Sequence, residues 1–124
     1  VPHSRHTGLN LKDLAAVPAL RVLASGRRTG PFLLSTENGR QIFVTGHPEY
    51  DLFTLDAEYR RDLEKGLEIS VPENYYPSDD PAQRPINRWR SHAHLLYHNW
   101  LNYYVYQTTP YDLEELSPLA GEPR

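Results

Sequence analysis

The stretch GHPEYD, which begins at Gly46, places a histidine and a glutamate on either side of one proline. In an extended chain the side chains of His47 and Glu49 would point to the same face, roughly 6–7 Å apart, and Pro48 would stiffen the backbone between them. A carboxylate near an imidazole can hold one tautomer and stabilise the imidazolium, so such a pair can act as a general base. The spacing alone is weak evidence, because a His-x-Glu pair at the end of a strand is more often an ordinary surface pair.

A general base of this kind requires a nucleophile within hydrogen-bonding reach. The chain contains no cysteine, and no serine lies in an obviously activating context. The sequence therefore supplies a candidate base without an evident nucleophile.

A second group of chemically capable side chains consists of His92, His94 and His98. The last two have the i, i+4 spacing of a helical metal pair, but a third ligand would have to come from elsewhere and no HExxH pattern is present. We therefore expect hydrogen-bonded, partly exposed histidines along a helix, and no metal site.

Two adjacent arginines, Arg60 and Arg61, follow the His-Pro-Glu turn on a segment with helical periodicity. A guanidinium can hold a carboxylate through two parallel hydrogen bonds, so either could bind an acidic substrate. An arginine on a helix more often faces solvent or pairs with a neighbouring acid, here Glu58 or Glu64.

The composition excludes several classes of protein. The 124 residues correspond to about one small domain, and 39% hydrophobic and 23% charged residues are ordinary for a globular chain. A net charge of −3 argues against a nucleic-acid partner, because nucleic-acid binders usually carry a basic surplus. No apolar run approaches the about 18 residues that span a bilayer, and the opening VPHSRH lacks the apolar core of a signal peptide. We therefore expect neither nucleic acid nor membrane as a partner.

The first half of the chain has the patterns of a short helix followed by strands. Asn10 can cap a helix that extends to Ala16. Asn38-Gly39 is typical of a tight hairpin turn, because both residues tolerate positive φ. Apolar runs of strand length occur at residues 20–24, 31–35 and 40–45.

The second half predicts two helices separated by a long loop. The first spans residues 55–65, with Thr54 as N-cap and Gly66 just beyond its end. The second spans residues 89–106 and is aromatic on nearly all sides, so we expect it to be buried on several sides. The fold class is α/β or α+β with a core that is thin for a free-standing domain, which suggests a missing partner surface.

Several stretches together resemble one family. GHPEYD resembles the His-Pro-Glu element of class I glutamine-amidotransferase-like domains. Four further stretches narrow the match, in this order and spacing, to the C-terminal part of the homoserine O-succinyltransferase and homoserine O-acetyltransferase family, and the resemblance covers nearly the whole chain. They are PHSR from Pro2, EYRRD from Glu58, NYYPSDDP from Asn74 and WRSHAHLLYHNWLNYYVYQTTPYDL from Trp89.

The resemblance implies a flavodoxin-like α/β fold and an acyl transfer from acyl-CoA to the hydroxyl of L-homoserine, a step of methionine biosynthesis. It implies a cysteine that carries the acyl group as a thioester. On the matching positions of this chain, it makes His47 the general base and Glu49 its orienting partner. It places Arg61 and Ser4 in the substrate site. It also implies a cytoplasmic homodimer that uses acyl-CoA as a substrate and needs no other cofactor.

The chain departs from the family pattern in one respect. The nucleophilic cysteine and a substrate-binding lysine belong to an upstream half, so we expect residues 1–124 to be a C-terminal portion whose choice between acetyl-CoA and succinyl-CoA depends on that half. The start at Val1, in a chain without methionine, fits both a fragment and a processed complete protein. Two alternatives stay open, a glutamine amidotransferase domain and a non-catalytic interaction module.

Overall fold

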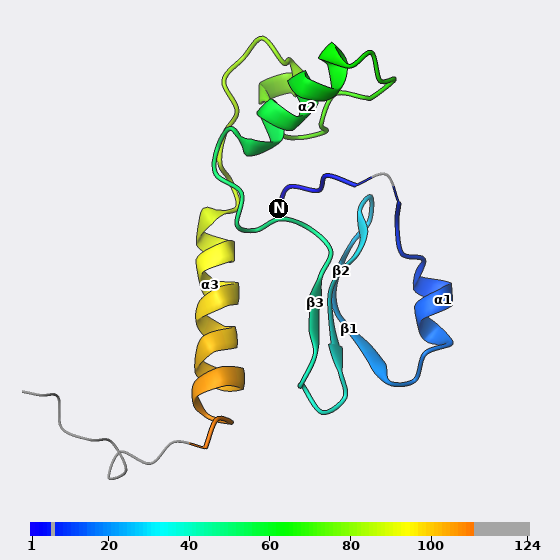
Figure 1. Cartoon of the computed structure of the whole chain (residues 1–124), viewed down its shortest axis with the longest axis vertical. Coiled ribbons are helices and arrows are strands. Elements are labelled where there is room, and N and C mark those ends of the chain that lie inside the picture. The colour runs from blue at the N-terminus through cyan, green and yellow to red at the C-terminus, as the bar shows by residue number, and fades with distance from the viewer. Residues whose placement is uncertain (6, 111–124) are drawn as a thin grey trace, which may run out of the picture.

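The structure is a computed structural model that describes residues 1–5 and 7–110. At one end of the molecule lie α2 and the loop that follows it, and at the other end α3 runs alongside a small sheet (Figure 1). The N-terminal segment passes between these two ends (Figure 1). The prediction of a mixed α/β fold is confirmed. In chain order the elements are α1 (Leu11–Ala15), β1 (Leu20–Gly26), β2 (Gly30–Thr36), β3 (Ile42–Val44), α2 (Thr54–Glu64), the 3-10 helix η1 (Pro77–Asp79), α3 (Arg90–Trp100) and the π-helix η2 (Leu101–Tyr106).

The sheet is antiparallel, with the strand order β1-β2-β3 and β2 in the centre. Leu34 of β2 is only 1% exposed and faces Phe43 of β3. The predicted turn between these strands is confirmed: Gly39 adopts a φ of 70°, and its N–H donates to the Thr36 carbonyl at 2.9 Å. A residue without Cβ adopts that conformation at little cost, which explains the Asn-Gly pair at this position.

Local capping residues define the ends of the helices. The Asn10 side chain accepts a hydrogen bond from the Lys12 N–H, as predicted for α1. At the end of α2, Gly66 has a φ of 72° and occupies the predicted C-terminal position. Thr54 as the N-cap of α2 was wrong, because the Asp51 carboxylate accepts from the N–H groups of Phe53 and Thr54 and takes over this function.

The main aromatic core lies against α2 and tethers the long loop. Leu55 of α2 is buried with Tyr75, Tyr76 and Trp89, which come from the loop and from the residue before α3. Apolar burial of this kind is the main stabilising contribution in a domain that has few other buried side chains. The long segment between α2 and α3 is therefore an ordered part of the fold.

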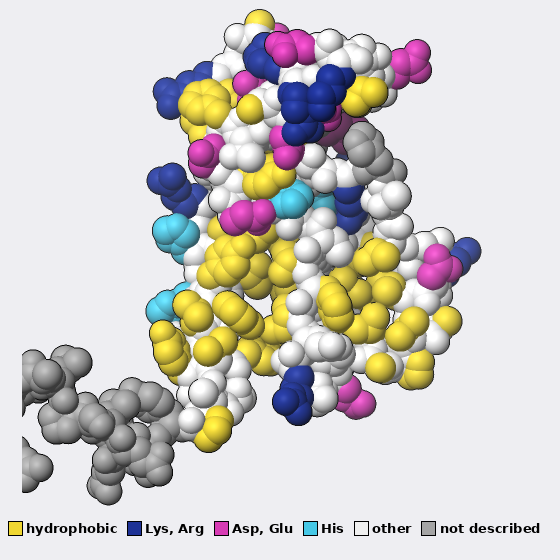
Figure 2. All heavy atoms as spheres, viewed as in Figure 1, with side chains coloured by type: hydrophobic (Ala, Val, Ile, Leu, Met, Phe, Trp, Pro, Cys, Tyr) yellow, Lys and Arg dark blue, Asp and Glu magenta, His cyan; other side chains and the backbone are white. Residues whose placement is uncertain are grey.

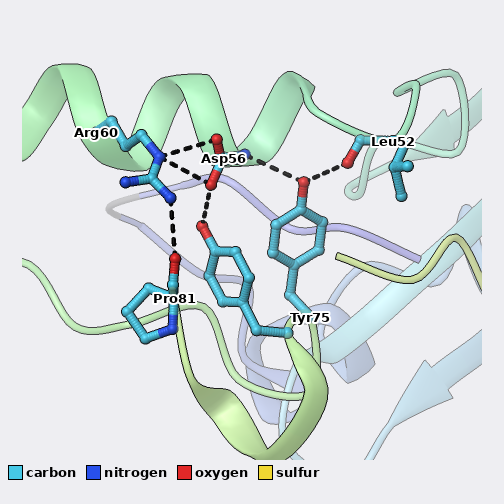
Figure 3. A network of polar contacts seen from close by, with 6 residues as sticks. Leu52, Asp56, Arg60, Tyr75 and Pro81 are labelled. Carbon is cyan, nitrogen blue, oxygen red and sulfur yellow. Dashed lines mark hydrogen bonds and ion pairs between the residues drawn. The ribbon is translucent and has the colours of Figure 1, made fainter. Parts of the chain in front are cut away.

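Polar contacts reinforce the same junction (Figure 3). The Asp56 carboxylate accepts from Arg60 Nε at 3.0 Å and from the Tyr76 hydroxyl at 2.7 Å. The Asp56 N–H donates to the Tyr75 hydroxyl at 3.2 Å, and Arg60 also donates to the Pro81 carbonyl at 2.9 Å. The hydrogen bond from Arg60 is the largest of the causes that lower the pKa of Asp56.

The aromatic helix differs from its prediction. We expected burial on several sides, but in the described chain α3 buries Ala93, whereas the large aromatic side chains of α3 and η2 are exposed. These are Tyr97, Trp100, Tyr103, Tyr104 and Tyr106. They were expected inside because the sequence is apolar there, but in the described residues each remains at least 40% exposed, even Tyr104, whose ring lies against Gly39.

An apolar groove of 980 Å³ separates this helix from the sheet. Phe43 and Val44 of β3 line one side, and Tyr97, Trp100 and Tyr104 line the other. Figure 2 shows hydrophobic side chains gathered over α3 and the strands, while charged side chains concentrate around α2. Across the described residues, no helix has both the length and the apolar character needed to cross a bilayer.

Replacing Asp56 with alanine should lower the free energy of unfolding by about 1–3 kcal/mol, because the buried Tyr76 hydroxyl loses its acceptor. The pKa of Asp56 is depressed from 3.8, so the carboxylate stabilises the fold above that unfolded-state value, and this contribution is lost as the pH falls through the folded-state pKa. Urea unfolding should therefore show a difference between parent and variant at neutral pH that shrinks in acid. Glu64→Ala, an exposed change on the same helix, is the control. An Asp56→Ala difference that is independent of pH would contradict the assignment.

Candidate active site

The side chains of His47 and Glu49 are in contact. His47 Nδ1 lies 2.8 Å from Glu49 Oε1. The expected extended geometry was wrong, because residues 47–50 form a turn in which the Tyr50 N–H faces the His47 carbonyl at 3.4 Å. The turn folds the carboxylate back onto the ring. A carboxylate accepts hydrogen bonds and cannot donate, so Nδ1 is the donor in this contact, and the neutral form of the ring has its lone pair at Nε2.

The N-terminal segment lies directly against the backbone of His47. The His47 N–H donates to the Pro2 carbonyl at 2.8 Å. Gly46 is buried there, and a Cβ at this position would lie 3.0 Å from both the Pro2 carbonyl oxygen and the His3 Nε2. The absence of a Cβ at Gly46 favours this close approach of the N-terminal segment. The contact at Pro2 keeps Ser4, two residues after Pro2, in the same region of the fold.

Ser4 lines a polar cavity of 320 Å³ together with Glu58 and Asp62 of α2. His3 also lines this cavity, and its Nδ1 is buried without a hydrogen-bond partner among the described residues. Burial first, and then the positive charge of Arg5, lower the pKa of His3 below its usual value of 6.5. The imidazole of His3 is therefore neutral at neutral pH.

Arg61 lies on α2, the helix that contributes Glu58 and Asp62 to the wall of this cavity. Its Nε donates to Asp62 Oδ1 at 2.8 Å, and that hydrogen bond is the main cause that raises the pKa of Arg61. The expectation of arginines that face solvent or pair with Glu58 or Glu64 holds in part: both side chains are more than half exposed, but their acidic partners are Asp56 for Arg60 and Asp62 for Arg61. The Arg61 side chain is 54% exposed, so an acidic ligand can reach it.

Tyr50 connects His47 to α2, and the sequence analysis did not single it out. Its ring is stacked on the His47 ring with centroids 4.3 Å apart and an interplanar angle of 16°. Its hydroxyl donates to Glu58 Oε1 at 2.8 Å. Burial and then this hydrogen bond raise the pKa of Tyr50 to about 12. Both Tyr50 and Glu58 fall within the motifs GHPEYD and EYRRD, which was the available signal.

The histidines of α3 do not form a metal centre with one another. His92, His94 and His98 are exposed, and among residues 1–5 and 7–110 no group of three or more histidine, cysteine or acidic side chains is arranged to hold a metal ion. His94 lines a small cavity of 270 Å³ beside Glu49 and Tyr50. It is thus the member of the three that approaches the His47 turn.

The described part of the chain brings no nucleophile to His47. The His47 ring is hydrogen-bonded to Glu49, and no serine or threonine hydroxyl of the described residues is bonded to this ring. The sequence has no cysteine at all. The arrangement is thus an oriented imidazole on a turn that is bonded to the N-terminal segment, and His3 and Ser4 of that segment line a polar cavity.

Comparison with known proteins places the chain in a family. Residues 1–111 match the model of the family described as homoserine O-succinyltransferase. The chain therefore belongs to the homoserine O-succinyltransferase family.

Relatives with high identity are named homoserine O-acetyltransferase. The protein from Desulfitobacterium hafniense (strain DSM 10664 / DCB-2) is 60% identical over 116 residues, which are 94% of this chain and 38% of the relative. The protein from Petrotoga mobilis is 53% identical with the same coverage of both chains. The protein from Brevibacillus brevis is 58% identical over 91% of this chain and 37% of its own length. The chain thus spans less than half the length of the relatives that it matches.

Replacing Gly46 with alanine should destabilise the protein by about 1–3 kcal/mol, because the new methyl group overpacks the contact with Pro2 and His3. The hydrogen bond from the His47 N–H should weaken, so this amide should exchange with deuterium faster. Gly8→Ala is the matched control, because a Cβ there meets nothing within 4 Å. If the His47 amide exchanges at the parental rate in Gly46→Ala, the proposed close packing is wrong.

Proposed function

We propose that the chain is the C-terminal part of a flavodoxin-like, class I glutamine-amidotransferase-like enzyme that transfers an acyl group from acyl-CoA to the hydroxyl of L-homoserine. The observation that carries the proposal is the 2.8 Å contact between His47 and Glu49, on a turn bonded to the segment whose Ser4 lines a polar cavity, in a chain of this family. An oriented imidazole is the group that such a transfer requires as a base.

The proposed reaction has two halves. A cysteine thiolate outside this chain attacks the acyl-CoA carbonyl, and the CoA thiolate leaves as the thioester forms. The homoserine hydroxyl then attacks that thioester while His47 Nε2 removes its proton, and the cysteine thiolate leaves. Glu49 stabilises the imidazolium that forms in the second half, because a negative charge lies 2.8 Å from Nδ1. Covalent catalysis of this kind divides one difficult transfer into two easier steps.

Substrate binding is assigned to Arg61 and Ser4. An exposed guanidinium on α2 can pair with the homoserine carboxylate, and the Ser4 hydroxyl can hydrogen-bond to substrate within the cavity. No cofactor is needed beyond acyl-CoA, which is itself consumed. The family description names a succinyl transfer and the relatives' names an acetyl transfer, so both donors belong in the assay.

The remaining part of the enzyme is proposed to supply the cysteine and to cover the apolar groove between β3 and α3. Two observations support this: the chain spans 38% of the length of its relatives, and the groove exposes aromatic side chains that a folded protein normally buries. On this proposal residues 1–124 are the C-terminal portion of one domain. A cytoplasmic location, a role in methionine biosynthesis and a homodimer follow from the family resemblance.

The proposal is tested in a hybrid protein, in which this chain replaces the matched segment of the Desulfitobacterium hafniense relative. His47→Ala in the hybrid should abolish acyl transfer from acetyl-CoA or succinyl-CoA to homoserine, because it removes the imidazole that Glu49 orients. Glutamine hydrolysis is measured alongside, since the His-Pro-Glu element also fits an amidotransferase. A His47→Ala hybrid with near-parental turnover, or a hybrid that hydrolyses glutamine and transfers no acyl group, would reject the proposal.

Arg61→Ala should raise the apparent KM for homoserine by about ten- to a hundred-fold, the loss expected for a charged hydrogen bond to a carboxylate, with a smaller change in kcat. Lys65→Ala serves as the control, because Lys65 is an exposed cation at the end of the same helix. An unchanged KM for homoserine would remove Arg61 from the substrate site.

A further inference from the structure

One hydrogen bond does not fully orient an imidazole. The contact from Nδ1 to Glu49 restrains the ring at one atom, but torsion about the Cα–Cβ and Cβ–Cγ bonds can still tilt the ring plane while the contact is kept. Such a rotation moves Nε2, the atom that must meet the substrate proton. Because proton transfer requires close and aligned approach, a second constraint on the ring plane is needed.

The stacked ring of Tyr50 supplies a constraint of this kind. The two rings are 4.3 Å apart and within 16° of parallel, so rotation of the imidazole out of its plane would bring it into collision with the phenol. The contact lies on one face of the imidazole and leaves its edge, with Nε2, unobstructed by Tyr50. The His47 side chain remains 34% exposed, which leaves room for a substrate.

Tyr50 can act as a fixed platform because it is held at two other points. Its hydroxyl donates to Glu58 on α2, and its carbonyl accepts from Trp89 Nε1 at 2.9 Å. Trp89 is 5% exposed and belongs to the aromatic core. Because the pKa of Tyr50 is raised to about 12, the hydroxyl keeps its proton and its bond to Glu58 throughout the neutral range.

We propose that Tyr50 is a positioning residue for His47, whose ring fixes the plane of the imidazole while Glu49 fixes its direction. The inference rests on the proposed role of His47 as general base. On this proposal the aromatic face of Tyr50 restrains the imidazole plane, and the hydroxyl only anchors that face to α2.

The test compares Tyr50→Leu with Tyr50→Phe in the hybrid enzyme. Tyr50→Leu removes the face and should lower kcat by about ten- to a hundred-fold, the effect of a misplaced catalytic group, while the KM for homoserine changes less than about two-fold. Tyr50→Phe keeps the face and should lower kcat by less than about three-fold. Phe53→Leu is the matched control, because this half-exposed aromatic lies on the same segment and is not stacked on His47.

A second readout does not depend on activity. The nuclear magnetic resonance signals of the His47 ring protons should carry an upfield ring-current shift from Tyr50 in the parent and in Tyr50→Phe, and should lose it in Tyr50→Leu. A Tyr50→Leu enzyme with parental kcat, or with an unchanged His47 signal, overturns the proposal. If Tyr50→Leu does not fold, Tyr50→Phe decides, and loss of either its shift or its kcat overturns the proposal.

Failure of the proposed function gives a different pattern. In that case His47→Ala retains turnover, whereas the ring-current shift still reports whether Tyr50 holds the imidazole. The two hypotheses therefore fail in separate measurements.

Discussion

The hydrogen bond from the His47 N–H to the Pro2 carbonyl, 2.8 Å long, joins the two parts of the chain on which the site depends. One part is the N-terminal segment that carries Ser4, and the other is the turn that carries His47 and Glu49. Gly46 permits this approach because it has no Cβ to meet Pro2 and His3. The contact places the N-terminal segment, whose Ser4 lines the cavity, against the backbone of His47.

From the same turn, contacts extend into α2 and the aromatic core. Asp51 caps α2, Tyr50 bonds to Glu58, and Trp89 bonds back to the Tyr50 carbonyl. The short stretch GHPEYD therefore holds the imidazole and also attaches the helix that carries Arg61. These contacts explain how a chain with a small core can still fix the geometry of the His47 turn.

Features fixed by local chemistry were predictable from the sequence. The Asn10 cap, the turn at Gly39 and the end of α2 at Gly66 each depend on residues that are close together in the chain. Contacts set by the tertiary fold were not predictable in this way. The capping of α2 by Asp51 replaced that expected of Thr54, and periodicity carries no information about the stacking of Tyr50 on His47.

The aromatic helix is a second feature whose surroundings could not be predicted from the sequence. Its apolar composition predicts a surface that needs a partner, but composition does not say whether that partner is in the same chain. In the described residues the partner is absent, so Trp100 and Tyr103 remain 43% and 60% exposed.

The most direct test of the account is the intact mass of the hybrid enzyme after mixing with acetyl-CoA or succinyl-CoA in the absence of homoserine. The account predicts the gain of one acyl group on a cysteine outside the present chain, which disappears when homoserine is added and persists when His47 is replaced by alanine. An acyl group carried by a residue of this chain, or one that is discharged to homoserine equally fast without His47, would contradict it.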